Sequence, residues 1–290
     1  MIHKINNGNI YISVDGLGAE LRSICDVHGT EFLWQGDPKV WEGQSPTIFP
    51  IVGRQKDDIY IYDGKEYFIE NHGFATACNF RVHEKYSDKL VLRLEQNKYT
   101  LERYPFDFCF DVCYELSDNS LYVRFKITNN SKKPMPYAVG GHPGFRVPIE
   151  EDEQFEDYYL RFDQVETCQA PHLIRDAMAE AENYIPVLEN TQYVKLTHDM
   201  FNKGVLVLET LKSRGVELLS QNSGKGIRMD FEGFDNLALW QMNNGNFLCI
   251  EPWTSPGSFT DESRLLEKRK GIIMLPPGET AEHGYKITLI

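Results

Sequence analysis

Four ionisable side chains stand where strand-like segments meet glycine or proline. Arg54 follows "IFPIVG", His72 lies in "ENHGFAT", His142 in "YAVGGHPGFRV" and Glu251 in "LCIEPW". Imidazole and carboxylate groups suit proton transfer at neutral pH, since their ordinary pKa values are about 6.5 and 4.3. A carboxylate that ends an apolar strand costs free energy unless it is hydrogen-bonded, exposed or functional. These four residues are therefore the candidates for acid–base chemistry.

Each candidate also has a simpler structural interpretation. A histidine beside glycine and proline often belongs to a turn, and Arg54 has Asp57 and Asp58 close by as ion-pair partners. Glu251 has possible partners among the basic residues of a neighbouring strand. The remaining six histidines have no such context, and we interpret them as surface or structural residues. The choice depends on the elements that position the four candidates.

Local signatures of several enzyme classes are missing from the sequence. It contains no G-x-S-x-G, no G-x-x-x-x-G-K-[ST], no H-E-x-x-H and no C-x-x-C. Cys109 and Cys113 lie on a strand-like run, roughly 13 Å apart at about 3.3 Å per residue, which is too far for a disulfide. We therefore expect no metal ion and no disulfide framework.

The composition limits the classes of partner. The 290 residues carry a net charge of −13, with 41% hydrophobic and 25% charged residues. Such a surface repels nucleic acid and anionic lipid, so we expect neither as a partner. No run approaches the roughly 20 apolar residues that span a bilayer. We expect a cytoplasmic protein, monomeric or weakly homodimeric, that binds a small molecule.

Alternating polar and apolar residues dominate the chain and predict β-strands throughout. Hairpins are predicted at Asp63-Gly64 and at Asn244-Gly245, and helices are predicted only at 172–183 and 260–271. No linker or repeat divides the chain. The sequence therefore predicts one all-β domain over residues 1–290, a sandwich or a barrel with few short helices.

The motifs, taken together and in order, resemble a known family. The series Arg, H-G-F, G-G-H-P-G-F, I-E-P-W and L-x-P-G-E is similar to that of the aldose 1-epimerase (galactose mutarotase) superfamily, in particular its LacX-type, mutarotase-related branch. The resemblance extends from "GAELRSI" to "PPGET". It implies a large antiparallel β-supersandwich that interconverts the α and β anomers of an aldohexose without a cofactor.

The resemblance also implies roles for individual residues. His142 takes the position of the general acid, and Glu251 takes that of the general base. Arg54 and His72 match positions that contact the sugar. Phe74 and Trp253 match positions in the pocket wall.

One motif departs from the family pattern. Relatives often read H-G-F-A-R, whereas this chain has Thr76 in the last position. A basic residue near there helps hexose-6-phosphate mutarotases to hold phosphate, so its loss makes a phosphorylated substrate less expected, although Arg81 or Lys56 remain as substitutes.

Three other functions remain as alternatives. One is a sugar-binding or sugar-sensing module without turnover, for which an intact acid–base pair would have no use. Another is a cupin-like metal site formed by His72, His142 and Glu251, although cupins use an H-x-H pair that this chain lacks. The third is a glycoside hydrolase or lyase, although hydrolases usually employ two carboxylates.

Overall fold

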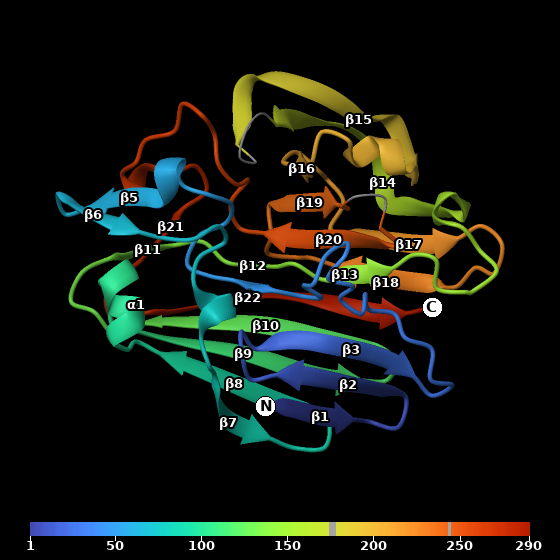
Figure 1. Ribbon diagram of the computed structural model, residues 1–290, viewed down its shortest axis with the longest axis horizontal. Coiled ribbons are helices and arrows are strands. Elements are labelled where there is room, and N and C mark those ends of the chain that lie inside the picture. Colours follow the sequence, from blue (N-terminus) through green and yellow to red (C-terminus); the bar gives the residue numbers. More distant parts are fainter. Residues whose placement is uncertain (174–177, 243–244) are drawn as a thin grey trace.

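The structure is a computed structural model that describes residues 1–173, 178–242 and 245–290, and it consists mainly of antiparallel β-sheet (Figure 1). The largest sheet has nine strands among the described residues. In spatial order these are β15 (Ala179–Lys195), β14 (Tyr158–Leu173), β17 (Gly215–Ser220), β18 (Gly226–Asp230), β22 (Thr280–Leu289), β10 (Ser120–Asn129), β9 (Phe108–Ser117), β8 (Lys89–Glu95) and β7 (Arg81–Lys85).

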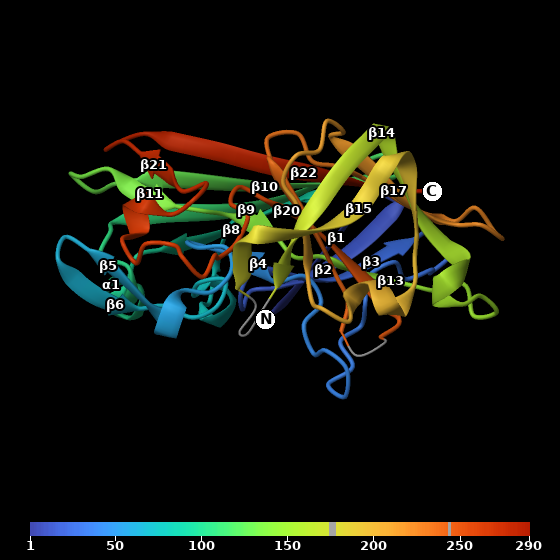
Figure 2. The same cartoon turned by 90° about the horizontal axis from the view of Figure 1, so that it is seen from above.

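A second sheet is centred on β20 and carries the candidate residue Glu251. Its strands are β16 (Leu206–Leu208), β19 (Asn236–Trp240), β20 (Phe247–Trp253), β12 (Gly140–Gly141), β4 (Thr47–Ile48) and β13 (Gly144–Arg146). The ribbon of β14 and β15 arches over this sheet (Figures 1 and 2), and β14 contacts β16.

Three small sheets complete the fold in the described part of the chain. They are the sheet of β1 (Ile2–Asn6), β2 (Ile10–Asp15) and β3 (Glu20–Asp26), the pair of β11 (Met135–Tyr137) with β21 (Ile273–Leu275), and the pair of β5 (Ile59–Tyr62) with β6 (Lys65–Phe68).

The β5–β6 hairpin confirms the turn predicted at Asp63-Gly64. Tyr62 pairs with Lys65, and both turn residues have positive φ, 50° for Asp63 and 73° for Gly64. Positive φ at both central positions is the geometry of a type I′ turn, whose twist matches that of the flanking strands. The turn predicted at Asn244-Gly245 lies partly outside the described residues.

The two predicted helices are wrong where the structure describes them. Residues 260–271 contain a single 3₁₀ turn, Leu266–Lys268, and residues 172–183 lie at the ends of β14 and β15, with 174–177 outside the described residues. Pairing between these two long strands overrides the helical preference of the alanine- and glutamate-rich segment. The α-helix among the described residues, α1 (Lys98–Arg103), has Asn97 as its N-cap, which is joined to Thr100 by a reciprocal capping box.

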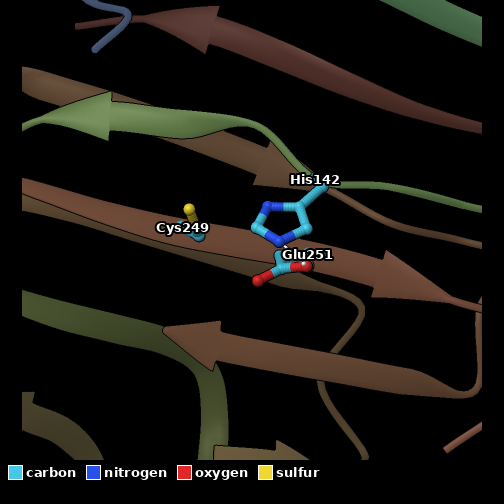
Figure 3. Close-up of side chains that lie close together, drawn as sticks. All are labelled: His142, Cys249 and Glu251. Atoms are coloured by element: carbon cyan, nitrogen blue, oxygen red, sulfur yellow. Dashed lines mark ion pairs between the residues drawn. The ribbon is translucent and has the colours of Figure 1, made fainter. Parts of the chain in front are cut away.

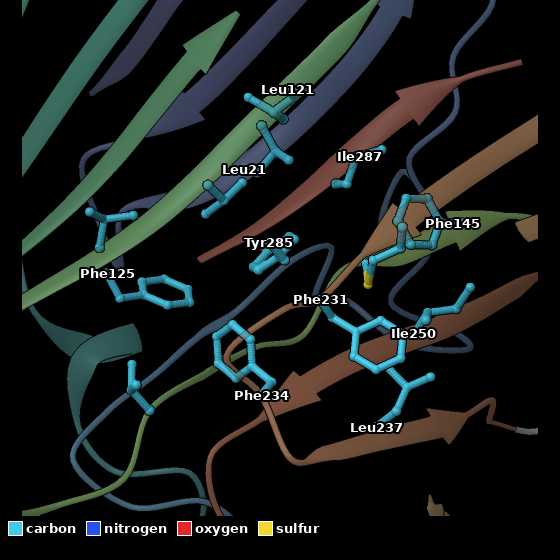
Figure 4. Close-up of a cluster of buried hydrophobic side chains, with 14 of the residues drawn as sticks. Leu21, Leu121, Phe125, Phe145, Phe231, Phe234, Leu237, Ile250, Tyr285 and Ile287 are labelled. Atoms are coloured by element: carbon cyan, nitrogen blue, oxygen red, sulfur yellow. The ribbon is translucent and has the colours of Figure 1, made fainter. Parts of the chain in front are cut away.

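One large hydrophobic cluster joins the sheets. Side chains from β3, β10 and β22 meet side chains from β13 and β20, including Leu21, Phe125, Phe145, Ile250 and Ile287 (Figure 4). Because β20 lies within this packing, all seven of its residues are buried. The site residues on β20 therefore sit on a rigid element.

No helix in the described part of the chain is long and apolar enough to cross a membrane.

Candidate active site

Strand pairing places His142 opposite Glu251. Gly140 on β12 pairs with Trp253, and Gly144 on β13 pairs with Cys249, so the same register brings the intervening His142 across from Glu251 on β20. Directly opposed residues of antiparallel strands have Cβ atoms about 5 Å apart. Two motifs distant in the sequence thus meet as a cross-strand pair.

The two side chains are in contact and shielded from water. His142 Nε2 lies 3.2 Å from Glu251 Oε2, and the side chains are 12% and 1% exposed (Figure 3). Side chains of a strand alternate between its two faces, so Cys249, Glu251 and Trp253 all point toward the same face of β20. The carboxyl group that seemed out of place on an apolar strand is thereby paired with the imidazole.

Aromatic rings hold the His142 imidazole in place. Trp41 stacks on it at 5.2 Å between ring centroids, and Trp240 approaches edge-on at 5.6 Å. Phe247 in turn stacks on Trp41 at 5.2 Å. Sequence reasoning missed both tryptophans because neither lies in a motif and each comes from a different segment of the chain.

The glycines before His142 allow close packing within the protein. A Cβ atom on Gly140 would lie 2.5 Å from Trp253 Cδ1, and one on Gly141 would lie 2.6 Å from Tyr285 Cε1. Such distances are shorter than a van der Waals contact, so only glycine fits without displacing these rings. The loop is held tightly against β20 and β22, which fixes where His142 points.

His72 reaches the same site from the loop after β6. It has a φ of 62°, and the following Gly73 has a φ of 81°. Its Nδ1 accepts a hydrogen bond from the backbone N–H of Gly53 at 3.1 Å, and its ring lies 5.6 Å from both His142 and Trp253. A neutral imidazole that accepts through Nδ1 carries its proton on Nε2, so His72 offers a fixed hydrogen-bond donor.

Burial shifts the pKa values of all three groups. It lowers the pKa of His142 to about 3, to which His72 contributes, and it lowers the pKa of His72 to about 4, to which the buried guanidinium of Arg269 contributes. Burial also raises the pKa of Glu251 well above its usual range, although the nearby Trp253 indole favours the carboxylate. Without a bound ligand, the pair therefore favours a protonated Glu251 beside a neutral His142.

The lowered pKa of His72 predicts a loss of stability in acid. The unfolded chain takes up this proton near pH 6.5 but the folded chain only near pH 4, so the free energy of unfolding falls as the pH decreases between these values. The contribution is at most about 3 kcal/mol, at about 1.4 kcal/mol per pKa unit. His72→Asn retains an acceptor for the Gly53 N–H and should flatten this part of the curve in urea denaturation. The exposed His28, changed to Asn, is the control, and an unchanged slope in His72→Asn would contradict the assignment.

Arg54 and Phe74 occupy different environments from the His142–Glu251 pair. Arg54 Nε lies 3.0 Å from Asp58 Oδ1, and its side chain is 40% exposed, as in the simpler interpretation of this residue. Phe74 is completely buried and packs against the rings of Phe49, Tyr104 and Phe108, so in this structure it belongs to the core. Trp253, by contrast, lines a small hollow together with His72, and its role in binding a sugar stays a prediction.

Arg269 is a third residue near the site that sequence reasoning missed. Its guanidinium is 1% exposed and lies 3.5 Å from Glu262, and its Nη2 donates to the backbone oxygens of Val52 and Gly257. These bonds join the segment before Arg54 to the loop after β20, both of which border the hollow beside His72. The residue lies in the stretch that we interpreted as a helix, which concealed its position.

A model of the family described as aldose 1-epimerase matches residues 1–288. The chain belongs to the aldose 1-epimerase family. It is 35% identical, over 298 residues and 100% of both chains, to the plasmid form of protein LacX from Lactococcus lactis subsp. lactis. The resemblance found in the sequence is thus confirmed.

Solved structures share the fold over the whole chain. A galactose mutarotase related enzyme from Lactobacillus acidophilus superposes with a TM-score of 0.94 at 31% identity, covering 100% of this chain and 97% of that one. A galactose mutarotase-like protein from Lactobacillus casei gives 0.93 at 27% identity, with 100% of both chains covered. The predicted all-β supersandwich with few short helices is confirmed, and a mutarotase-like, sugar-binding enzyme is the function class that the family supports.

Proposed function

We propose that the protein is a mutarotase that interconverts the α and β anomers of a free aldohexose, with His142 as general acid and Glu251 as general base. The observation that carries this proposal is the buried contact of 3.2 Å between the imidazole and the carboxyl group. Opening a cyclic hemiacetal requires the removal of one proton and the delivery of another on neighbouring oxygens, which an adjacent acid and base can perform together.

The proton transfers balance within the pair. Glu251 takes the proton of the C1 hydroxyl, the C1–O5 bond breaks, and His142 delivers a proton to O5, which leaves an open aldehyde beside a protonated Glu251 and a neutral His142. Rotation about C1–C2 turns the other face of the carbonyl toward O5. The transfers then run in reverse, and C1 closes with the opposite configuration. The site ends in its starting state, so one shared proton supports every turnover.

Burial favours a protonated Glu251 beside a neutral His142, and this is the protonation state that accompanies the open aldehyde. For the cyclic sugar, the proton moves from Glu251 to His142, and we infer that the sugar hydroxyls promote this by hydrogen-bonding the charged forms. His72 is neutral at neutral pH, because its pKa is lowered to about 4, and it contributes its Nε2–H as a hydrogen-bond donor. The neighbouring tryptophans supply apolar faces on which a pyranose ring can stack.

The placement of Arg81 and Arg269 favours a free sugar over a phosphorylated one. Arg81 lies on β7, the last strand of the nine-stranded sheet, and pairs with Glu95 at 2.8 Å. Thr76 is exposed and packs near Gly18, and the buried Arg269 has Glu262 as its counter-ion. With a net charge of −13, these residues offer a phosphate group little attraction.

Saturation-transfer NMR at anomeric equilibrium, together with polarimetry of freshly dissolved α-D-glucose and α-D-galactose, tests this function. Glucose 6-phosphate is measured by NMR under the same conditions. Faster exchange of a free hexose that is lost in Glu251→Gln supports the proposal. Faster exchange of the phosphate ester alone would overturn the choice of substrate, and binding without acceleration of any sugar would indicate a sugar-sensing module.

Arg54 is expected to bind the sugar rather than to transfer protons. We expect Arg54→Ala to raise KM about tenfold and to change kcat less, because one charge-assisted hydrogen bond contributes roughly 1.5–3 kcal/mol, part of which Asp58 already satisfies. Asp58→Asn releases the guanidinium and should leave KM equal or lower. Steady-state rates for the two variants check this, and an unchanged KM in Arg54→Ala would remove Arg54 from the site.

A further inference from the structure

A third metal-ligating side chain lies beside the His142–Glu251 pair. Cys249 stands two residues before Glu251 on β20, and Figure 3 shows its sulfur on the same side of the strand as the carboxyl group and the imidazole. One ligand atom from each of these three residues lies within 4.8 Å of the other two. All three are held by the β12–β13 pairing with β20 and not by a mobile surface loop.

The spacing and the chemistry of this set fit a tetrahedral soft metal. Zinc–nitrogen, zinc–oxygen and zinc–sulfur distances of about 2.0–2.3 Å place neighbouring ligand atoms roughly 3.3–3.8 Å apart. His142 Nε2 and Glu251 Oε2 are already 3.2 Å apart, and the Cys249 sulfur lies within 4.8 Å of a ligand atom of each of these residues. Three protein ligands with a fourth position open are typical of zinc sites that bind small molecules.

The charge of the complex also suits a buried position. Zn²⁺ displaces the protons of the Cys249 thiol and the Glu251 carboxyl group to solvent, so that one thiolate, one carboxylate and one neutral imidazole balance its charge and the complex carries no net charge. Apart from its 3.2 Å contact with His142 Nε2, which belongs to the same set, Glu251 Oε2 is buried without a hydrogen bond among the described residues, so no group outside the set competes for it. A calcium or magnesium ion, which prefers oxygen ligands alone, does not fit this set.

We propose that His142, Cys249 and Glu251 form an inhibitory site for Zn²⁺ or a similar thiophilic divalent cation, which competes with the sugar. The inhibition rests on the proposed function, whereas metal binding does not. A metal bonded to His142 Nε2 and to the Glu251 carboxylate occupies the atoms that exchange protons with O5 and O1. The sugar and the metal therefore exclude each other, and the inhibition disappears on chelation.

Cobalt(II) is the probe that tests the site without reference to activity. A thiolate bound to Co²⁺ gives a charge-transfer absorption in the near ultraviolet, which the wild-type protein and the control Cys113→Ser should both show. Cys113 is a partly exposed thiol on β9, away from the set. Cys249→Ser and Cys249→Ala should lack the band, provided that circular dichroism shows each to be folded. A band that persists in both variants, or that is absent from the wild type, would overturn the proposed site.

Inhibition is then measured with zinc in a metal-buffered assay. We expect zinc to raise the KM for the sugar, and we expect the inhibition constant to rise at least about tenfold in Cys249→Ser relative to Cys113→Ser, since one of three protein ligands is lost. Equal inhibition of the two variants would overturn the assignment. If the cobalt band appears but no sugar is turned over, the metal site stands and the mutarotase function fails.

Discussion

Glu251→Gln should lose mutarotation by about 10²- to 10⁴-fold in kcat and leave the fold intact. A positioned proton transfer usually contributes this much to a rate, and the amide accepts no proton at neutral pH. Because burial raises the pKa of Glu251 well above its usual range, the native side chain is favoured in its neutral form, which glutamine resembles in size and polarity. The free energy of unfolding should therefore change by less than about 1 kcal/mol.

Two measurements separate a catalytic role from a structural one. NMR exchange rates give the turnover of a free hexose, and urea denaturation gives the stability of the same preparation. Glu95→Gln is the control, because Glu95 is an exposed carboxylate that pairs with Arg81 far from the site. A variant at position 251 that kept more than a tenth of the wild-type rate would show that the reaction uses another base.

The sequence predicted the identity of the pair but not the way in which the fold brings it together. His142 and Glu251 lie in recognisable motifs, and their residue types indicate the chemistry. Their contact depends on β12 and β13 both pairing with β20, which is a long-range register that no local pattern specifies. The type I′ turn at Asp63-Gly64 was predictable because both residues of the turn encode it.

The residues that were missed depend on tertiary contacts. Trp41 and Trp240 enclose His142 from separate segments, and Arg269 crosses from one loop to another. Likewise, the segment 172–183 has a helical composition, but where the structure describes it the chain follows β14 and β15, because interstrand pairing outweighs a weak local preference. Single motifs thus indicated candidate chemistry, whereas the surroundings that tune the pKa values required the whole fold.

His142→Ala should lose activity to a similar extent, and added imidazole should restore part of it. The truncation leaves space between the Trp41 and Trp240 rings, in which a small imidazole can take the place of the lost ring and deliver the proton to O5. His83→Ala, at an exposed position on β7, is the control and should not respond to imidazole.

Since the native pair needs one shared proton, its rate should fall both when the site gains a second proton at low pH and when it loses the proton at high pH. In His142→Ala rescued by imidazole, the decline of the rate at low pH should follow the pKa of the added base. Rates measured with imidazole and with methylated imidazoles test this dependence. A merely structural His142 would give no rescue and no dependence on the added base, and that result would assign the acid to another group, with His72 as the nearest alternative.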